Sequence, residues 1–320
     1  MTTAAPRRLI IDTDVAMGAP GEDIDDGFAL AFAVAEPRLR LELVTTVEGN
    51  TDVDSATVLA TDLLRRLGRQ DIPVIRGADR AILGLRRPRA RQSDVLDRLG
   101  PPPPASQHAA TAIVDHVMAH PDEVTLAAIG PLTNIATALA IEPGLADAID
   151  EIVLMGGYFF GTQGNATVPG EFNIWADPEA AVRVLRSGAR IRMVGLDVTY
   201  QVRMNRQQAA ELAENGGEFG RFAGACGLGW IETLRQRYPK STTHGTFHLH
   251  DPLAVAVVAY PELISWTDAH VDVALDGVAR GVTIADIGGH PDERAPNALI
   301  ARDVDAERFV ALLLERLASV

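Results

Sequence analysis

Residues 9–35, LIIDTDVAMGAPGEDIDDGFALAFAVA, decide the fold of this chain. The stretch opens with a short apolar run, passes through a segment rich in Asp and Gly, and ends in an apolar helical pattern at 26–35. An apolar run this short, without polar alternation, is typical of a strand that is covered on both faces, as in a parallel sheet. The stretch therefore predicts a strand and a helix with a cluster of acids between them.

The same alternation of apolar runs and amphipathic stretches continues along the first two thirds of the chain. We expect further strands at 41–47, 74–75, 124–129, 152–155 and 191–196, and helices at 52–67, 107–119, 133–141 and 177–187. Asp177 with Pro178 provides a helix start, and Ser106 is expected to cap the helix at 107. The alternation predicts an α/β fold, namely a doubly wound, mostly parallel central sheet with helices on both faces.

Two regions depart from this alternation. Residues 79–105 contain four consecutive prolines and mixed charges, and they are expected to form a surface excursion. The last third predicts a helical block at 206–238, strands near 271–275, 282–286 and 298–301, and a final helix at 305–318. Because no internal repeat or long linker divides the chain, we expect one domain over residues 1–320.

Composition excludes several classes of protein. The formal net charge is −14 and Lys240 is the only lysine, so nucleic acid is not an expected partner. The short basic stretch RRPRAR at 86–91 is expected to be a solvated loop. Cys226 is the only cysteine, which excludes an internal disulfide and favours a reducing compartment. Without a signal h-region or an apolar run of roughly 20 residues, the protein is expected to be cytoplasmic, with no membrane contact.

Five aspartates crowd the junction between the first strand and the first helix. They are Asp12, Asp14, Asp23, Asp25 and Asp26. Open parallel sheets bind ligands beyond the carboxyl ends of their strands, which is where these acids lie. Carboxylates so close together repel one another, and a hard cation such as Ca²⁺ or Mg²⁺ relieves that repulsion. Helix capping explains one of these acids and not the group.

Polar side chains follow other predicted strands as well. Asn50 follows the second apolar run, and the sequence GPLTN, which includes Thr133, follows the fourth. Far downstream, HLHDPLAVAVV places His248, His250 and Asp251 directly before an apolar helix. Each of these motifs alone is compatible with a simple turn or helix start. Together they predict acids, amides and imidazoles along one edge of the sheet.

The ordered set of motifs resembles the inosine-uridine preferring nucleoside hydrolase family. It includes DTD, DD, EGN, GPLTNIA, VLMGG, GNATVPGEFNIWADPEAA, HDP and PNA, and it runs through nearly the whole chain. One feature differs, because ten residues separate Asp14 from Asp25 where the family usually has about three. An inserted loop within VAMGAPGEDI accounts for the difference and leaves the position of Asp23 open.

The resemblance implies a calcium site and an acid that activates water. Asp14, Asp26, Asp251 and the backbone carbonyl of Thr133 are expected to hold Ca²⁺, with water and the ribose hydroxyls at the remaining positions. Asp14 is also expected to act as the general base on the calcium-bound water. By the same resemblance Asp25 binds the ribose 2′ hydroxyl and Asp12 supports the site from behind.

The resemblance also implies roles in binding sugar and base. The expected sugar-binding residues are Asn50, Met155, Asn165, Glu171 and Asn173. Asn173 is further expected to act in catalysis, because amide oxygens and buried carboxylates stabilise the oxocarbenium-like cation that forms as the bond breaks. His250 is expected near the leaving base as a proton donor, and Phe172 is expected to pack beside the base.

The implied reaction is hydrolysis of the N-glycosidic bond of a ribonucleoside to ribose and free base, by a homodimer or homotetramer acting in nucleoside salvage. Two alternatives stay open. The insertion after Asp14 leaves room for a non-catalytic homologue that binds calcium and nucleoside. DTDV also resembles the opening motif of haloacid dehalogenase-type phosphatases, although Lys240 has no acidic motif behind it. Base preference is not determined by these motifs.

Overall fold

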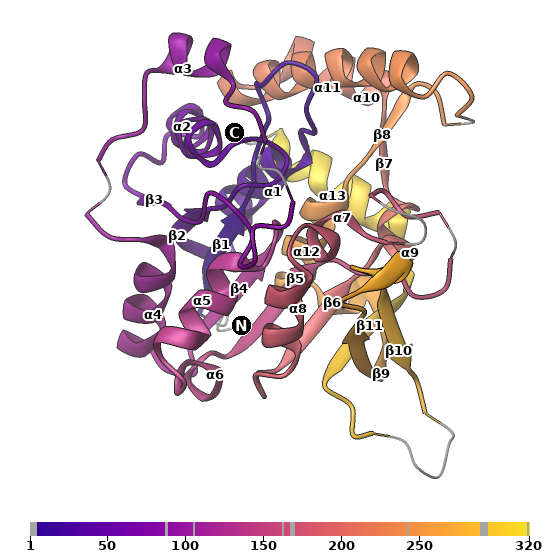
Figure 1. The fold of residues 1–320 in the computed structure, drawn as a ribbon. Helices are drawn as coiled ribbons and strands as arrows, with labels where there is room; N and C mark the ends of the chain where they lie inside the picture. The colour runs from indigo at the N-terminus through magenta and orange to yellow at the C-terminus, as the bar shows by residue number, and fades with distance from the viewer. Residues whose placement is uncertain are drawn as a thin grey trace.

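A computed structural model describes residues 5–86, 89–104, 106–161, 163–166, 170–241, 243–288, 294–318 and 320. Among these residues, nine strands form one sheet in the order β10-β9-β11-β6-β5-β4-β1-β2-β3 (Figure 1). Their bounds are β1 (Arg7–Thr13), β2 (Leu39–Thr46), β3 (Val74–Arg76), β4 (Val124–Ala128), β5 (Glu151–Met155), β6 (Ile191–Val194), β9 (Ile264–Val273), β10 (Thr283–Asp286) and β11 (Ala298–Val304).

Strand direction confirms the mostly parallel sheet. Every pairing from β3 across to β11 is parallel, whereas β9 pairs in antiparallel fashion with both β11 and β10. The helices are α1 (Asp25–Ala35), α2 (Val53–Arg66), α3 (Ser93–Leu99), α4 (Ala109–Ala119), α5 (Thr133–Ile141), α6 (Leu145–Ala148), α7 (Phe172–Ala176), α8 (Pro178–Leu185), α9 (Leu196–Thr199), α10 (Arg206–Asn215), α11 (Glu218–Arg237), α12 (His250–Ala259) and α13 (Ala306–Leu317).

Helices cover both faces of the sheet, as the sequence predicts. Along β1, Leu9 and Ile11 belong to a core built with α1, α2, α12 and α13, while Ile10 belongs to a second core built with α4, α5 and α8. Successive side chains of a strand point to opposite faces, so a continuous apolar run fills both cores. The polar residues that follow each strand are thereby brought to the carboxyl edge of the sheet.

One local expectation was wrong, and two others were incomplete. The helix expected at 107 begins at Ala109, and the capping side chain is His108, whose Nδ1 accepts from the backbone N–H of Ala110 at 3.2 Å, instead of Ser106. The expected excursion at 79–105 contains the helix α3, which is anchored by its buried Val95 and Leu96. The expected helical block at 206–238 is two helices, α10 and α11.

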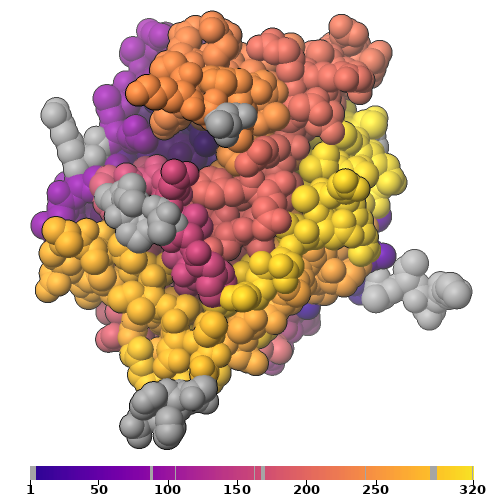
Figure 2. Space-filling view, turned by 90° about the vertical axis from the view of Figure 1, so that its right-hand side faces the viewer, coloured from indigo at the N-terminus to yellow at the C-terminus, as the bar shows by residue number. Residues whose placement is uncertain are grey.

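The α10–α11 hairpin stands over the carboxyl edge of the sheet. It is joined to the body by a two-stranded antiparallel ribbon of β7 (Arg203–Asn205) and β8 (Thr246–His248). Residues from about 200 to 250 form a continuous block, coloured salmon to orange, at the top of Figure 2. Within the described part of the chain, no helix has the length and apolar character that crossing a bilayer demands.

Candidate active site

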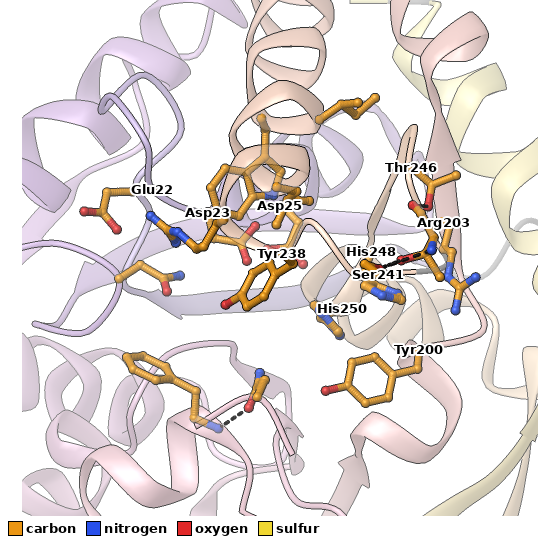
Figure 3. Close-up of a pocket in the computed structure, with 18 of the residues that line it drawn as sticks. Glu22, Asp23, Asp25, Tyr200, Arg203, Tyr238, Ser241, Thr246, His248 and His250 are labelled. Atoms are coloured by element: carbon orange, nitrogen blue, oxygen red, sulfur yellow. Dashed lines mark hydrogen bonds between the residues drawn. The ribbon is translucent and has the colours of Figure 1, made fainter. Parts of the chain in front are cut away.

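A cavity of about 1280 Å³ opens at the carboxyl edge of the sheet, beneath the α10–α11 hairpin (Figure 3). Strand ends form its floor, and the end of α11 and the start of α12 form its upper wall. Nine residues expected at the site from the sequence line it: Asp25, Asn50, Met155, Asn165, Glu171, Phe172, Asn173, His250 and Asp251. The fold therefore brings together groups that lie far apart along the chain.

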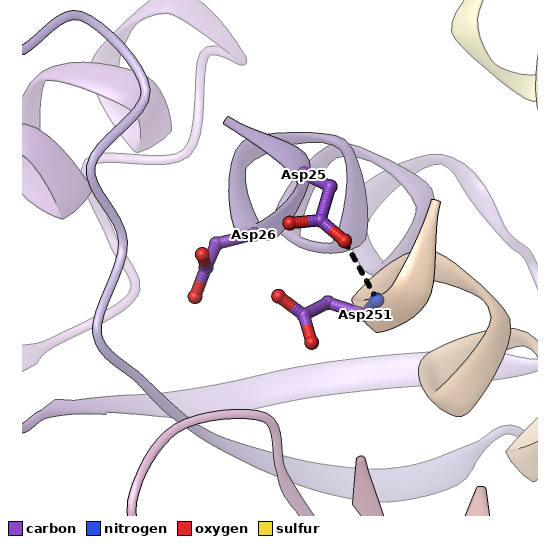
Figure 4. Close-up of side chains that lie close together, drawn as sticks. All are labelled: Asp25, Asp26 and Asp251. Atoms are coloured by element: carbon purple, nitrogen blue, oxygen red, sulfur yellow. Dashed lines mark hydrogen bonds between the residues drawn. The ribbon is translucent and has the colours of Figure 1, made fainter. Parts of the chain in front are cut away.

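Three buried carboxylates converge where two helices begin (Figure 4). Asp25 and Asp26 open α1, and Asp251 lies in the first turn of α12. One oxygen from each of the three lies within 4.8 Å of the others, and the backbone N–H of Asp251 donates to Oδ2 of Asp25 at 3.0 Å. The partial positive charge of two helix N-termini helps to hold this negative charge in place.

Asp14 lies beside this group and is fully buried. Its Oδ2 accepts from the backbone N–H of Asn50 at 2.7 Å, while the side-chain amide of Asn50 donates to Asp26 at 3.2 Å. Gly49 permits this close approach, because a Cβ at that position would lie 2.0 Å from Oδ2 of Asp14. The other oxygen, Oδ1, has no hydrogen-bond partner among the described residues.

Asp12 supports the site from within β1. Its Oδ1 accepts from the hydroxyl of Thr45 and from the side-chain amide of Asn134 at 2.8 Å. Its Oδ2 is buried and has no hydrogen-bond partner among the described residues. Burial raises the pKa of Asp12 to about 7, although these two hydrogen bonds act in the opposite direction.

The electrostatics of the group favour a bound cation. Burial raises the pKa of Asp14, Asp25 and Asp251 well above the usual value, and the neighbouring carboxylates raise each pKa further. A buried carboxylate without a partner of opposite charge strongly destabilises the folded protein, and the four carboxylates of this group, including that of Asp26, do so together. The unpartnered Oδ1 of Asp14 and the all-oxygen donor set fit a hard divalent cation.

The carbonyl of Thr133, an expected calcium ligand, accepts a hydrogen bond within α5. Thr133 is the first residue of α5, its carbonyl accepts from the Thr137 hydroxyl at 2.7 Å, and its own hydroxyl donates to Asp177. Thr133 is not among the residues that line the cavity, whereas Ile129, at the end of β4, is. Ile129 is therefore the residue of this segment that lines the cavity, and its carbonyl accepts from the side-chain amide of Asn173 at 3.1 Å.

Glu171 organises the opposite wall. It caps α7 by accepting from the backbone N–H groups of Asn173 at 2.9 Å and Ile174 at 3.0 Å, and it also accepts from Gly157 at 3.3 Å. Burial raises the pKa of Glu171 to about 7 despite these bonds. The carboxyl of Glu171 is thus positioned by the backbone and poised between its charged and neutral forms.

Asn173 and Asn165 are fixed by backbone contacts. The side-chain amide of Asn173 donates to the carbonyls of Ile129 and Met155, both at 3.1 Å, which leaves its oxygen free to face the cavity. Asn165 is exposed, and its Oδ1 accepts from the backbone N–H of Phe172 at 2.7 Å. Hydrogen bonds thus connect Met155, Asn165, Glu171 and Asn173 along one wall, whereas Asn50 bonds to Asp14 and Asp26.

His250 belongs to a ring cluster on the other side of the cavity. Its Nδ1 is 2.7 Å from the Thr199 hydroxyl, and its ring centroid lies 5.1 Å from that of His248 and 5.7 Å from that of Tyr200. Burial lowers the pKa of His250, so its imidazole is neutral. Tyr200 was not predicted as a site residue. It follows the short helix α9, which comes directly after β6, so its place after a strand of the sheet was an available signal.

Comparison with known proteins decides what this arrangement belongs to. The model of the family described as "Inosine-uridine preferring nucleoside hydrolase" matches residues 9–311. The chain belongs to this family. It is 35% identical to the probable uridine nucleosidase 1 of Oryza sativa subsp. japonica, with 88% of this chain and 85% of that protein covered.

Two further relatives extend the match. The non-specific ribonucleoside hydrolase RihC of Klebsiella pneumoniae (strain 342) is 35% identical, with 94% of this chain and 95% of that protein covered. A solved plant nucleoside hydrolase superposes with a TM-score of 0.88 at 32% identity, covering 98% of this chain and all of that one. Of these three names, one specifies uridine, one says non-specific and one gives no base.

Proposed function

We propose that this nucleoside hydrolase cleaves the N-glycosidic bond of ribonucleosides and releases ribose and free base. Family membership supports the reaction. The observation that carries it is the convergence of four buried carboxylates at a cavity large enough for a nucleoside. Asp25 and Asp251 line the cavity, and Asp14 and Asp26 both accept hydrogen bonds from Asn50, which also lines it. The amides on one side of the cavity and the imidazoles on the other provide hydrogen-bonding groups for the ribose and for the base.

We infer that the cation is Ca²⁺. The donors that would hold it are Asp14, Asp26 and Asp251, together with a backbone carbonyl, for which Ile129 replaces our expectation of Thr133 because it lines the cavity. All of these donors are oxygen atoms, which is the ligand set calcium prefers. When bound, the cation lowers the pKa of water and orients the ribose diol.

Asp14 is the general base in this proposal. The backbone of Asn50 holds one of its oxygens, which leaves Oδ1 to orient a water molecule and accept its proton. Asp25 accepts from the ribose 2′ hydroxyl, and its position at the cavity wall supports that role. Their negative charge, with the free amide oxygen of Asn173, stabilises the positive charge that develops on the sugar.

The remaining walls divide between sugar and base. Asn50, Met155, Asn165 and Glu171 hold the ribose, and Phe172 packs beside the base. His250 donates a hydrogen bond from its ring N–H to the departing base, with its ring oriented by Thr199. The lowered pKa keeps this ring neutral, so His250 supplies a hydrogen bond and the proton that the base takes up comes from water. The resemblance also leads us to propose a homodimer or homotetramer, which light scattering of the purified protein measures directly.

The test is base release from a panel of purine and pyrimidine ribonucleosides by wild type and Asp14→Asn. The variant keeps the shape of the side chain but cannot accept the proton, so we expect a loss of about 10³-fold or more in kcat. Asp305→Asn is the matched control, because Asp305 caps α13 far from the cavity. Equal rates for Asp14→Asn and the control would exclude the assigned base.

The same assay separates the alternatives. A non-catalytic homologue binds nucleoside in calorimetry and releases no base, whereas a phosphatase releases phosphate from a nucleotide and leaves the N-glycosidic bond intact. A 2′-deoxynucleoside lacks the hydroxyl that Asp25 would bind. We expect its kcat/KM to fall by about 10²-fold or more, because a buried carboxylate is left without its partner.

A further inference from the structure

The ten residues between Asp14 and Asp25, which include the expected insertion, connect three separate elements of the fold. Val15, Ala16 and Met17 are fully buried, so the segment is anchored in the core behind the site. Beyond these residues the chain arches away from the sheet toward α11, visible as the indigo loop that rises beside that helix in Figure 1. We refer to residues 15–24 as the inserted segment.

Two backbone carbonyls of the inserted segment accept hydrogen bonds from arginines on opposite sides. Arg98 of α3 donates to the carbonyl of Gly18 at 2.8 Å, and Arg237, the last residue of α11, donates to the carbonyl of Gly21 at 2.8 Å. Both glycines have positive φ, 102° and 77°, a conformation that other residues rarely adopt. The turn that presents these carbonyls is therefore specified by sequence.

Side-chain contacts also connect the inserted segment to the residues before α3 and to the end of α11. The amide of Gln92 donates to Glu22 at 3.3 Å, and the positive charges of Arg89 and Arg237 oppose the rise that burial causes in the pKa of Glu22. Glu22 and Asp23 both line the cavity. The inserted segment thus forms part of the cavity wall, in contact with the segments before α3 and at the end of α11.

The bond from Arg237 also fixes aromatic groups that face the cavity. The guanidinium carbon of Arg237 lies 5.5 Å from the ring centre of Trp230, and both residues line the cavity with Tyr238. Figure 3 shows Tyr238 inside the cavity, in front of Asp25. Aromatic rings at this position can stack on a heterocyclic base, and the position of the helix end decides where they lie.

We propose that the inserted segment is a positioning brace, which holds the end of α11 at the cavity through the Arg237–Gly21 hydrogen bond so that Trp230 and Tyr238 contact the base. This inference rests on the proposed hydrolysis of ribonucleosides and deepens it. Because the brace acts on the base and not on the sugar, its loss weakens binding of a nucleoside and leaves the sugar site intact.

Arg237→Met tests the brace and Arg221→Met is the matched control. Arg221 is on the same helix and also donates to a glycine carbonyl, that of Gly216 at 2.8 Å, but it does so within the hairpin. For Arg237→Met we expect the KM of uridine and inosine to rise about tenfold, since a charge-assisted bond and a cation–π contact are lost. The kcat should change by less than about twofold.

A competitive inhibitor without a base separates positioning from general damage. The Ki of 1,4-anhydroribitol, a cyclic sugar that lacks the base, should be the same in wild type and Arg237→Met. Arg98→Met, which removes the bond on the α3 side, should raise KM in the same direction. A Ki that rises in parallel with KM, or a KM no higher than that of Arg221→Met, would overturn the proposal.

Hydrogen–deuterium exchange tests the brace independently of activity. Amides of residues 230–241 should exchange faster in Arg237→Met than in wild type or Arg221→Met, because the end of α11 has lost its attachment. Unchanged exchange would contradict the brace even if the enzyme is active. Conversely, a wild type that releases no base from any nucleoside refutes the proposed function, and the exchange result then decides the brace alone.

Discussion

At the scale of single residues, backbone groups hold the Asp14 carboxylate in place. Asn50 provides the N–H that fixes Oδ2, and Gly49 provides the space. The sequence predicts Asp14 as a site residue from its place after a strand, but it does not predict the role of Gly49. A close backbone approach depends on how two distant strands pair, and one glycine in a sequence does not report that pairing.

Gly49→Ala tests this packing. The added Cβ would meet Oδ2 of Asp14 at 2.0 Å, so the carboxylate must move and its bond to Asn50 is lost. We expect kcat/KM to fall by about 10²-fold, because general-base catalysis depends on position. Gly229→Ala is the control, since a Cβ there meets nothing within 4 Å. Equal activity in the two variants would refute the constraint.

The raised pKa of Glu171 predicts how the stability of the protein depends on pH. Its pKa in the folded protein is about 7, above the ordinary 4.5, so its contribution to stability is present below pH 4.5 and is lost as pH rises through 7. In metal-free protein this loss is about 2 kcal/mol between pH 5 and 8. Glu171→Gln cannot ionise, so its free energy of unfolding in urea should fall less over this range. A decline as steep as that of wild type would contradict the raised pKa.

The expected role of Thr133 shows that residue types alone do not predict which backbone carbonyl faces the cavity. The motif GPLTN marks the right segment, because it follows a strand of the sheet. Which carbonyl of the segment faces the cavity depends on where α5 begins, and every residue carries the same carbonyl. Residue types therefore identify Asp25, Asp26 and Asp251 but cannot distinguish Thr133 from Ile129.

At the scale of elements, Asp177 joins three parts of the α/β framework behind the site. It caps α8 by accepting from Ala180 at 3.1 Å, and it also accepts from the hydroxyl of Thr133 at 2.7 Å and from the backbone N–H of Ile82 at 2.8 Å. The sequence predicts the cap from the Asp-Pro pair. The other two bonds join α5 and the segment after β3, and sequence alone does not predict them.

Asp177→Ala should therefore destabilise the protein more than the loss of an ordinary cap. We expect about 3 kcal/mol, because one capping bond, one further buried bond from Thr133 and one partly buried bond from Ile82 are lost. Asp305→Ala removes an exposed cap of α13 that makes one such bond, at 3.1 Å to Arg308, and should cost about 1 kcal/mol. Urea unfolding of both variants measures the difference, and equal losses would show that the two further bonds contribute nothing.

Elements were predicted well where apolar runs are buried and poorly where few apolar residues mark them. The strands from β1 to β6 were all anticipated, since each contains a short apolar run, and all of them except the half-buried edge strand β3 are mostly buried. Helix α3 was missed because only Val95 and Leu96 of its seven residues are buried. The break between α10 and α11 falls at Gly216 and Gly217, two adjacent glycines that were available as a signal.

At the scale of the whole molecule, the order of strands could not be deduced from the sequence. The crossover from β3 to β4 returns the chain to the middle of the sheet, and β9, β11 and β10 extend the far side. Short apolar runs indicate strands but not their neighbours, because pairing depends on contacts distant in sequence. The site depends on that order, since β1 pairs with β2 on one side and β4 on the other, which places Asp12 between these two strands and Asp14 directly after it.

We expect one cooperative unfolding transition for the whole chain. The nine-stranded sheet of the described residues uses segments from Arg7 to Val304, so no part of it can be removed without exposing a core. Calorimetry should give equal calorimetric and van't Hoff enthalpies. Two separate transitions would contradict the single domain that we propose.

The central claim is that the converging carboxylates hold a divalent cation on which nucleoside hydrolysis depends. The most direct measurement is the initial rate of base release by chelator-treated protein as Ca²⁺ is added back. We predict a negligible rate without the cation and a saturable recovery with added Ca²⁺. In Asp251→Asn the recovery should need a higher Ca²⁺ concentration. A full rate in the absence of any divalent cation would contradict it.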